Sequence, residues 1–492
     1  MPRGRVIAVR LGVSALALAA VDARADDLRE ALVSAYVTNP TLQAARANQR
    51  ATDENVPIAK AAGRPAANAN ASLTQIVDPT GSSTSDLGGG LMTEGPTRTL
   101  NAGVNLSVPL YSGGAVKNQV RAAERRVEAG QADLRGTESA IFSQTVGAYM
   151  DVILQQAVVG LNRNNVQVLT VNLEATRDRF EIGDLTRTDV AQSEARLALA
   201  RSDTRTAEAN LINARERYIQ VVGKTPLDLQ PPPPLPNLPA TPDEAVAVAL
   251  DNNPDIEAAR ERSRAADYDI NVASASRLPQ VSAVVGGSYS NTLGSFRIIG
   301  SPIQPAQSSS GLTIGLQGSI PLFQGGRPAA QRRQAQARAG AALEQEIGAE
   351  RDVIAQTRSA FSSWRAANDV IISSQAAVDA ATLSLEGVRA ENSVGNRTIL
   401  DILDAEQELL SAQVRLVTAR RSAYVAGFTL LAAMGKAEAR DLGLDGGLLY
   451  DPETNYRRVR GKWFDWENDP PPVAKATRTV DTPAQTGAIS AP

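Results

Sequence analysis

The 492-residue chain contains no cysteine and no histidine. A disulfide framework, a zinc site built from these ligands, a thiol nucleophile and a Ser-His-Asp triad are therefore excluded. Carboxylate and lysine chemistry remains, but no constellation of these residues forms a convincing active site. The glycine pairs match neither dinucleotide-binding nor phosphate-binding loops. We expect no enzyme activity, no catalytic residues, no metal and no cofactor.

Aromatic residues and net charge are also scarce. Aromatic side chains make up 4% of the chain, too few for a thick globular core of large residues. Fifty basic and fifty-three acidic residues leave no basic footprint, so we exclude a nucleic-acid partner. The long segments are instead rich in Ala, Gln, Arg, Glu and Leu, which is typical of extended helices that pack at thin seams.

Long hydrophobic runs are missing as well. An apolar stretch of eleven residues, 11–21, is shorter than the about 20 residues that a membrane-spanning helix needs. Arginines precede this stretch and Ala23-Arg24-Ala25 follows it, which is the layout of a secretory signal peptide with its cleavage site. We predict that residues 1–25 are removed and that the mature chain begins at Asp26.

The chain contains an internal repeat. V-P-L-Y-S-G-G at 108–114 returns 212 residues later as I-P-L-F-Q-G-G at 320–326. Asn39-Pro40 also returns, at an offset of 214, as Asn253-Pro254. Further matches at 212 pair Gly183, Thr186, Asp189, Glu194 and Gly223 with Gly395, Thr398, Asp401, Glu406 and Gly435. We therefore interpret 26–229 and 243–440 as copies of one unit.

Each copy has the same order of elements. A first helix, Leu28 to Ala62 or Pro242 to Ser276, is interrupted by its Asn-Pro pair. A strand pair follows, and then a long proline-free stretch that is interrupted once, at Gly183-Asp184 or Gly395-Asn396. Each such stretch predicts a very long helix and a shorter one. The first long helix, 115–181, would extend about 100 Å.

Alternation of apolar and polar residues predicts the strands. It is clear at 312–322 and 104–110 and weaker at 67–73 and 281–289. Strands of about ten residues can cross a bilayer when tilted. Because about eight strands are the practical minimum for a closed barrel, the chain must oligomerise if its four strands face lipid. An ordinary soluble antiparallel sheet is the alternative.

The last helix carries two apolar seams, which predict one neighbouring helix on each flank, although packing on a broad core would give the same pattern. The seams comprise Ile399, Leu403, Leu410, Val414, Val417, Tyr424, Phe428 and Leu431, and Ile402, Leu409, Leu416, Ala423 and Leu430. Asp401 and Asp404 lie on one face, opposite the midpoint of these seams, and so point to a lumen or to solvent. Around a symmetry axis they would form a ring of negative charge with some raised pKa values. For Asp401 alone, a capping box with Thr398 is an alternative role.

Two segments lie outside the repeats. Residues 230–242 are proline-rich and predict a stiff connector. The tail, 441–492, is expected to be equatorial or partly disordered. Its aromatic residues are Tyr456, Trp463, Phe464 and Trp466, and its polar composition favours disorder from about Asp469 onward.

The chain resembles the TolC-like outer-membrane efflux proteins of Gram-negative bacteria. The resemblance covers about 27–436 and rests on the Asn-Pro pairs, the two Gly-Gly motifs, R-F-E-I-G-D-L-T-R-T-D-V at 179–190 and S-V-G-N-R-T-I-L-D-I-L-D-A at 393–405. It implies a mixed α/β membrane protein: a homotrimer in which a 12-stranded β-barrel continues into a 12-helix periplasmic α-barrel. Its partners would be outer-membrane lipid, a periplasmic membrane-fusion adaptor and an inner-membrane ABC or proton-driven transporter.

The resemblance also implies a gate at the periplasmic helical tip. Asp401 and Asp404 would form the constriction ring, and Arg397 would link to Thr188 and Asp189 to hold the tip closed. Asn392 stands where well-studied members have a tyrosine, which predicts a weaker or rearranged lock.

We therefore expect an exit duct of the outer membrane, with a periplasmic extension, that serves a tripartite efflux or type I secretion system. The sequence leaves open whether the cargo is protein, small toxic compounds or both. A periplasmic coiled-coil adaptor or scaffold without a pore is the alternative. A carboxylate hydrolase is disfavoured because Asp401 and Asp404 lie opposite the seams and not in a predicted pocket.

Overall fold

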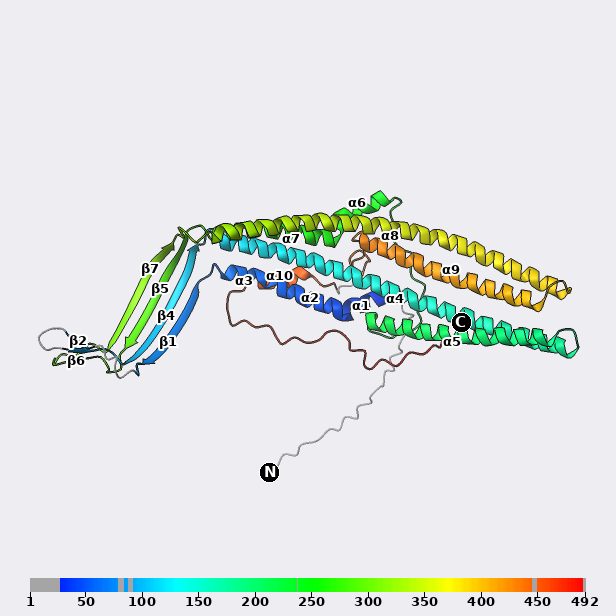
Figure 1. Cartoon of the computed structure of the whole chain (residues 1–492), viewed down its shortest axis with the longest axis horizontal. Helices are drawn as coiled ribbons and strands as arrows, with labels where there is room; N and C mark the ends of the chain where they lie inside the picture. The colour runs from blue at the N-terminus through cyan, green and yellow to red at the C-terminus, as the bar shows by residue number, and fades with distance from the viewer. Residues whose placement is uncertain (1–26, 78–83, 87–91, 237, 445–448, 490–492) are drawn as a thin grey trace, which may run out of the picture.

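The computed structural model describes residues 27–77, 84–86, 92–236, 238–444 and 449–489. The predicted signal peptide, 1–25, lies outside these ranges. The molecule is elongated, with a sheet at one end and two long helical hairpins that end together at the other (Figure 1). Among the helices of the described ranges, none combines the length and apolar character needed to cross a membrane.

Short helices begin each repeat, as the Asn-Pro pairs predicted. They are α1 (Leu28–Thr38), α2 (Pro40–Asp53) and α3 (Asn55–Ala61) in the first repeat, and α6 (Pro242–Asn252) and α7 (Pro254–Ala275) in the second. Asn39 ends α1 and caps α2, and its amide donates to the Val221 carbonyl oxygen (3.0 Å). Asn253 does the same between α6 and α7 and donates to the Ala433 carbonyl oxygen (2.9 Å). Each asparagine thus joins its helix junction to the end of the repeat's last helix.

The strands of both repeats form one antiparallel sheet. Its order is β1-β4-β5-β7, with β1 (Ala66–Gln75), β4 (Arg98–Tyr111), β5 (Gln280–Asn291) and β7 (Ser308–Ser319). The central pair, β4 and β5, comes from different repeats, so β1 and β7 are the open edges. Three short strands that we did not predict form a second sheet: β2 (Thr84–Asp86), β3 (Met92–Glu94) and β6 (Arg297–Ile299).

The predicted strand over 312–322 is too long. β7 ends at Ser319, opposite Gln280, the first residue of β5, and the I-P-L-F segment lies beyond the strand. Pro279, which precedes β5, has no N–H to continue the ladder. The matching V-P-L-Y segment stays within β4, where a register shift between Pro109 and Tyr111 accommodates the proline.

The long helices agree closely with the proline-free stretches. They are α4 (Ala115–Glu181), α5 (Arg187–Val222), α8 (Arg327–Ser393) and α9 (Ile399–Ala433). α4 and α8 each have 67 residues, which corresponds to about 100 Å. α9 packs against both α8 and α4, so the prediction of two neighbours is confirmed.

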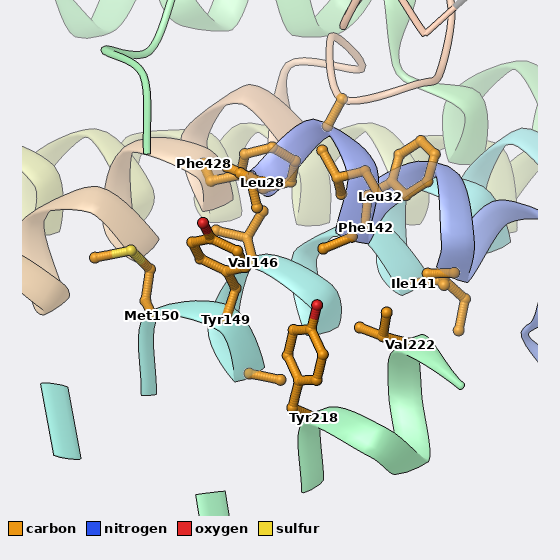
Figure 2. Packing of buried hydrophobic residues seen from close by; sticks show 14 of the residues in the cluster. Leu28, Leu32, Ile141, Phe142, Val146, Tyr149, Met150, Tyr218, Val222 and Phe428 are labelled. Carbon is orange, nitrogen blue, oxygen red and sulfur yellow. The ribbon is translucent and has the colours of Figure 1, made fainter. Parts of the chain in front are cut away.

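The largest hydrophobic cluster lies where the short helices α1 and α2 pack on the long helices, and Figure 2 shows its residues from α1, α4, α5 and α9. Phe142 and Tyr149 of α4 and Phe428 of α9 are almost completely buried in it. The Tyr149 hydroxyl donates to the carbonyl oxygen of Gln230 in the connector (2.6 Å). The connector is thereby fixed to the helical wall.

The tail follows the outside of the helices. After α10 (Pro452–Val459), which packs on α2, the chain turns back along α5. Arg163 donates to the Gly487 carbonyl oxygen (3.2 Å), and the Gln485 N–H donates to Glu216 (3.2 Å). Parts of 477–487 thus contact α4 and α5, and the disorder expected from about Asp469 onward stays a prediction.

Candidate gate at the tip of the helical hairpins

The α4–α5 and α8–α9 hairpins turn in the same way. Gly183 and Gly395 adopt positive φ angles of 85° and 84°, which glycine tolerates without strain. The N–H of Asp184 bonds to the Arg179 carbonyl oxygen (2.9 Å), and the N–H of Asn396 makes the matching bond to Glu391 (3.0 Å). These six-to-one bonds are typical of a helix that ends at a left-handed glycine. The duplication therefore extends to the geometry of both tips.

A capping box begins each returning helix, as proposed for Thr398 and Asp401. The Asp401 carboxylate accepts hydrogen bonds from the Thr398 hydroxyl (2.7 Å) and backbone N–H (2.8 Å). These two bonds, the hydroxyl first, lower the pKa of Asp401 below its ordinary value. Thr186 and Asp189 repeat the arrangement on α5. In one protomer, Asp401 is therefore an ionised carboxylate that also holds the turn.

Arg397 and Asn392 lie within the α8–α9 turn. Arg397 donates to Glu391 (2.7 Å) and lies 3.8 Å from Asp401, and hydrogen bonding to Glu391 raises the pKa of Arg397. The Asn392 amide donates to the Arg397 carbonyl oxygen (2.7 Å). These contacts lie within one hairpin, so the link from Arg397 to Thr188 and Asp189 of the other hairpin stays a prediction.

Asp404 forms an ion pair that we did not predict. Its carboxylate accepts a hydrogen bond from Arg196 of α5, so the pair joins the two repeats near the tip. The Asp404 side chain is 59% exposed and that of Arg196 is 34% exposed. In the repeat register, Asp404 aligns with Gln192 and Arg196 aligns with Glu408. These two charge differences between the halves are the sequence signal that could have suggested the pair.

Glu406 forms a second polar link between the repeats. Its side chain is 4% exposed and accepts hydrogen bonds from Arg389 of α8 (2.9 Å) and Asn172 of α4 (2.7 Å). In the first repeat, Arg177 and Glu194 have the same separation in sequence and form the same ion pair, with an N–O distance of 2.6 Å. Both of these side chains are about half exposed. Only the glutamate thus differs in burial, since Arg389 is also about half exposed, and Glu406 alone contacts α4 through Asn172.

An apolar cluster lies beside these links. Leu403 of α9 is buried among side chains of α4 and α5: Leu169, Leu173, Leu197 and Ala200. This packing holds the second repeat against the first close to the charged residues. Within the part of the chain that the structure describes, no group of three or more carboxylates could hold a metal ion.

A family model described as "Outer membrane efflux protein" matches the chain twice, over residues 31–224 and 245–436. The outer membrane efflux protein BepC of Brucella suis is 35% identical over 460 residues, which cover 93% of this chain and 96% of BepC. The outer membrane protein TolC of Escherichia coli is 29% identical over 65% of this chain and 67% of TolC. The crystal structure of the Campylobacter jejuni CmeC outer membrane channel superposes with a TM-score of 0.70 at 16% identity, covering 94% of this chain and 98% of CmeC.

Proposed function

The chain belongs to the outer membrane efflux protein family, and from this we propose that it is the exit duct of a tripartite export system. The family consists of channel proteins and not of enzymes. The protein therefore belongs to the outer membrane, with its helical hairpins extending into the periplasm. We propose that its carboxylates serve conduction and that it catalyses no reaction.

We propose that three protomers assemble around one axis. The observation that carries this proposal is the four-stranded sheet with two open edges, continued by helices about 100 Å long. Every residue of β1 is exposed in the protomer, as is nearly every residue of β7. An open edge strand is a template for pairing with another chain. Pairing β1 of one protomer with β7 of the next would close twelve strands and align twelve helical segments below them.

In this trimer the tip would contain the gate. Asp401 and Asp404 of three protomers would form the constriction, which attracts cations. Arg397 would reach Thr188 and Asp189 across the hairpins, and Asn392 would act through the Arg397 backbone that it holds. Support comes from the two hairpins, which end at the same level and have matching turns (Figure 1).

We propose that a periplasmic adaptor docks at these turns and couples the duct to an inner-membrane ABC or proton-driven transporter. Ile182 and Val394 occupy equivalent positions in the two turns and are 80% and 70% exposed. Exposed apolar side chains at a helical tip suit contact with another protein. The near full-length similarity to an outer membrane efflux protein favours efflux as the process that the duct serves.

Single-channel recording of detergent-purified protein in planar bilayers tests the proposal. We expect cation-selective pores whose selectivity falls when Asp401→Asn and Asp404→Asn are combined. A protein that needs no detergent for extraction and forms no pores would support the periplasmic scaffold instead. Selectivity that survives the double replacement would remove the constriction ring from the proposal.

A further inference from the structure

The tail carries an exposed aromatic segment, residues 460–467, which we name the aromatic loop. Trp463, Phe464 and Trp466 are 54%, 71% and 93% exposed, although the whole chain has only three tryptophans. Single apolar residues are common on protein surfaces, but three large rings within four residues form a patch. Such a patch indicates a contact with an apolar surface.

The aromatic loop is held beside the start of the sheet. Lys60 of α3 donates to the Arg460 carbonyl oxygen (3.1 Å), and Arg64 donates to the Lys462 carbonyl oxygen (2.6 Å). The Arg64 guanidinium also lies over the Trp463 ring, 4.6 Å from its centroid. Arg64 precedes the first residue of β1 by two positions. Figure 1 shows the chain passing α3 at this level before it turns back along the helices.

Other exposed aromatic residues lie at the same end of the sheet, where the strands lead into the helices. Tyr111, the last residue of β4, is 50% exposed, and Phe323, just beyond β7, is 89% exposed. Between the two ends of the sheet, β7 exposes three alternating apolar side chains, Leu312, Ile314 and Leu316. An apolar band flanked by aromatic residues is the pattern of strands that cross a bilayer.

We infer that the aromatic loop is an interfacial anchor that inserts its three rings into the headgroup region of the periplasmic phospholipid leaflet. This inference rests on the proposed function, because it requires the sheet to lie in the outer membrane. Tryptophan suits this zone because its ring is apolar and its indole N–H is polar. Arg460 and Lys462 precede the rings, and Asp465 and Glu467 lie among and after them, so residues 460–467 carry two positive and two negative charges and have no net positive charge. The loop therefore recognises the interface itself and does not require anionic lipid.

Fluorescence quenching by brominated phosphatidylcholine tests the anchor. Full-length protein carrying Trp364→Phe retains only the two loop tryptophans and is reconstituted in vesicles with bromine near the headgroup or near the chain end. We expect a large loss of emission with the shallow bromine and a smaller loss with the deep one. The matched control combines Trp463→Phe with Trp466→Phe and retains Trp364, which lies in the helical wall beside the connector. Its emission should change little.

A second control keeps an exposed tryptophan on the same tail but away from the sheet. Val480 is 78% exposed and lies between Thr477, which contacts Gly223 at the end of α5, and Gln485, which contacts Glu216. Val480→Trp, in a chain whose three native tryptophans are replaced by phenylalanine, should not be quenched. Quenching at this site equal to that of the loop would overturn the anchor.

Conductance of the same vesicles separates the two proposals. Vesicles that conduct ions but leave the loop tryptophans unquenched would overturn the anchor and retain the exit duct. A blue-shifted but unquenched emission would show that a neighbouring protomer covers the rings, which also overturns the anchor. Quenching without any conductance would contradict the duct and retain the lipid contact.

Discussion

Arg196→Gln tests the charge balance at the tip most directly. The replacement removes the positive partner of Asp404 but keeps a long polar side chain. Because both side chains are partly exposed, the ion pair contributes only about 0.2–1 kcal/mol to stability. The protein should therefore fold and assemble. The larger effect concerns permeating ions, since the proposed trimer loses three positive charges near its constriction.

The expected magnitude follows from Coulomb's law. A unit charge about 8 Å from a permeating ion contributes about 0.5 kcal/mol in water, so three contribute about 1.5 kcal/mol. Screening with a Debye length of about 10 Å, as in 0.1 M salt, reduces this sum to about 0.7 kcal/mol. Cations gain this energy and anions lose it, so the cation-to-anion permeability ratio should rise about tenfold. In 1 M salt the increase should be less than about twofold.

Reversal potentials across a KCl gradient in planar bilayers measure this ratio. Asp404→Asn should shift selectivity in the opposite direction, and the double variant should return close to the wild-type value. Arg205→Gln is the matched control, because Arg205 lies on the same helix but pairs with Glu208. An unchanged reversal potential in Arg196→Gln, or an equal shift in Arg205→Gln, would refute the reasoning.

Three other replacements test the fold and the tip. Tyr149→Phe removes the 2.6 Å hydrogen bond to the connector and should lower the free energy of unfolding by about 1 kcal/mol, measured by denaturant titration. Gly435→Ala forces a side chain into a φ of 69° and drives its Cβ into the carbonyl oxygen of Asn252 at the end of α6. It should lower the melting temperature more than Gly395→Ala, whose site is open; equal losses would contradict the steric argument. Thr398→Ala should raise the lowered pKa of Asp401 toward its ordinary value. A carboxylate with a lowered pKa stabilises the turn above its ordinary pKa, and this stabilisation is lost as the pH falls through the lowered value. When conductance is measured from neutral to acidic pH, the Thr398→Ala channel should therefore open at a higher pH than the wild-type channel. Identical conductance–pH profiles of the variant and the wild type would contradict the role of the capping box in holding the tip closed.

Local signals explain what the sequence predicted well. The two long helices, the breaks at Asn39 and Asn253 and both capping boxes depend on residues close together in the chain, and the structure agrees with each. One local signal was missed. Pro57 has no N–H for the carbonyl of Asp53, so the first helix breaks a second time, at Glu54.

Contacts between distant segments could not be predicted in the same way. Arg196 and Asp404 are 208 positions apart, and Arg64 and Lys462 are 398 apart. Neither pair has a local pattern, because each depends on how the two repeats and the tail are placed in three dimensions. Composition likewise does not reveal which side chains the tail contacts, such as the Glu216 carboxylate of α5, which accepts a hydrogen bond from the Gln485 N–H.

The pairing of β4 with β5 has a consequence for the order of folding. The central contact of the sheet joins residues such as Asn101 and Ser290, which are 189 positions apart. The intervening chain includes the α4–α5 hairpin, whose two helices follow each other in the sequence and pack along each other. Local contacts form before those that close long loops. The helical hairpins should therefore be folded in the periplasm before the membrane part has a complete sheet, and insertion should be the last and slowest step.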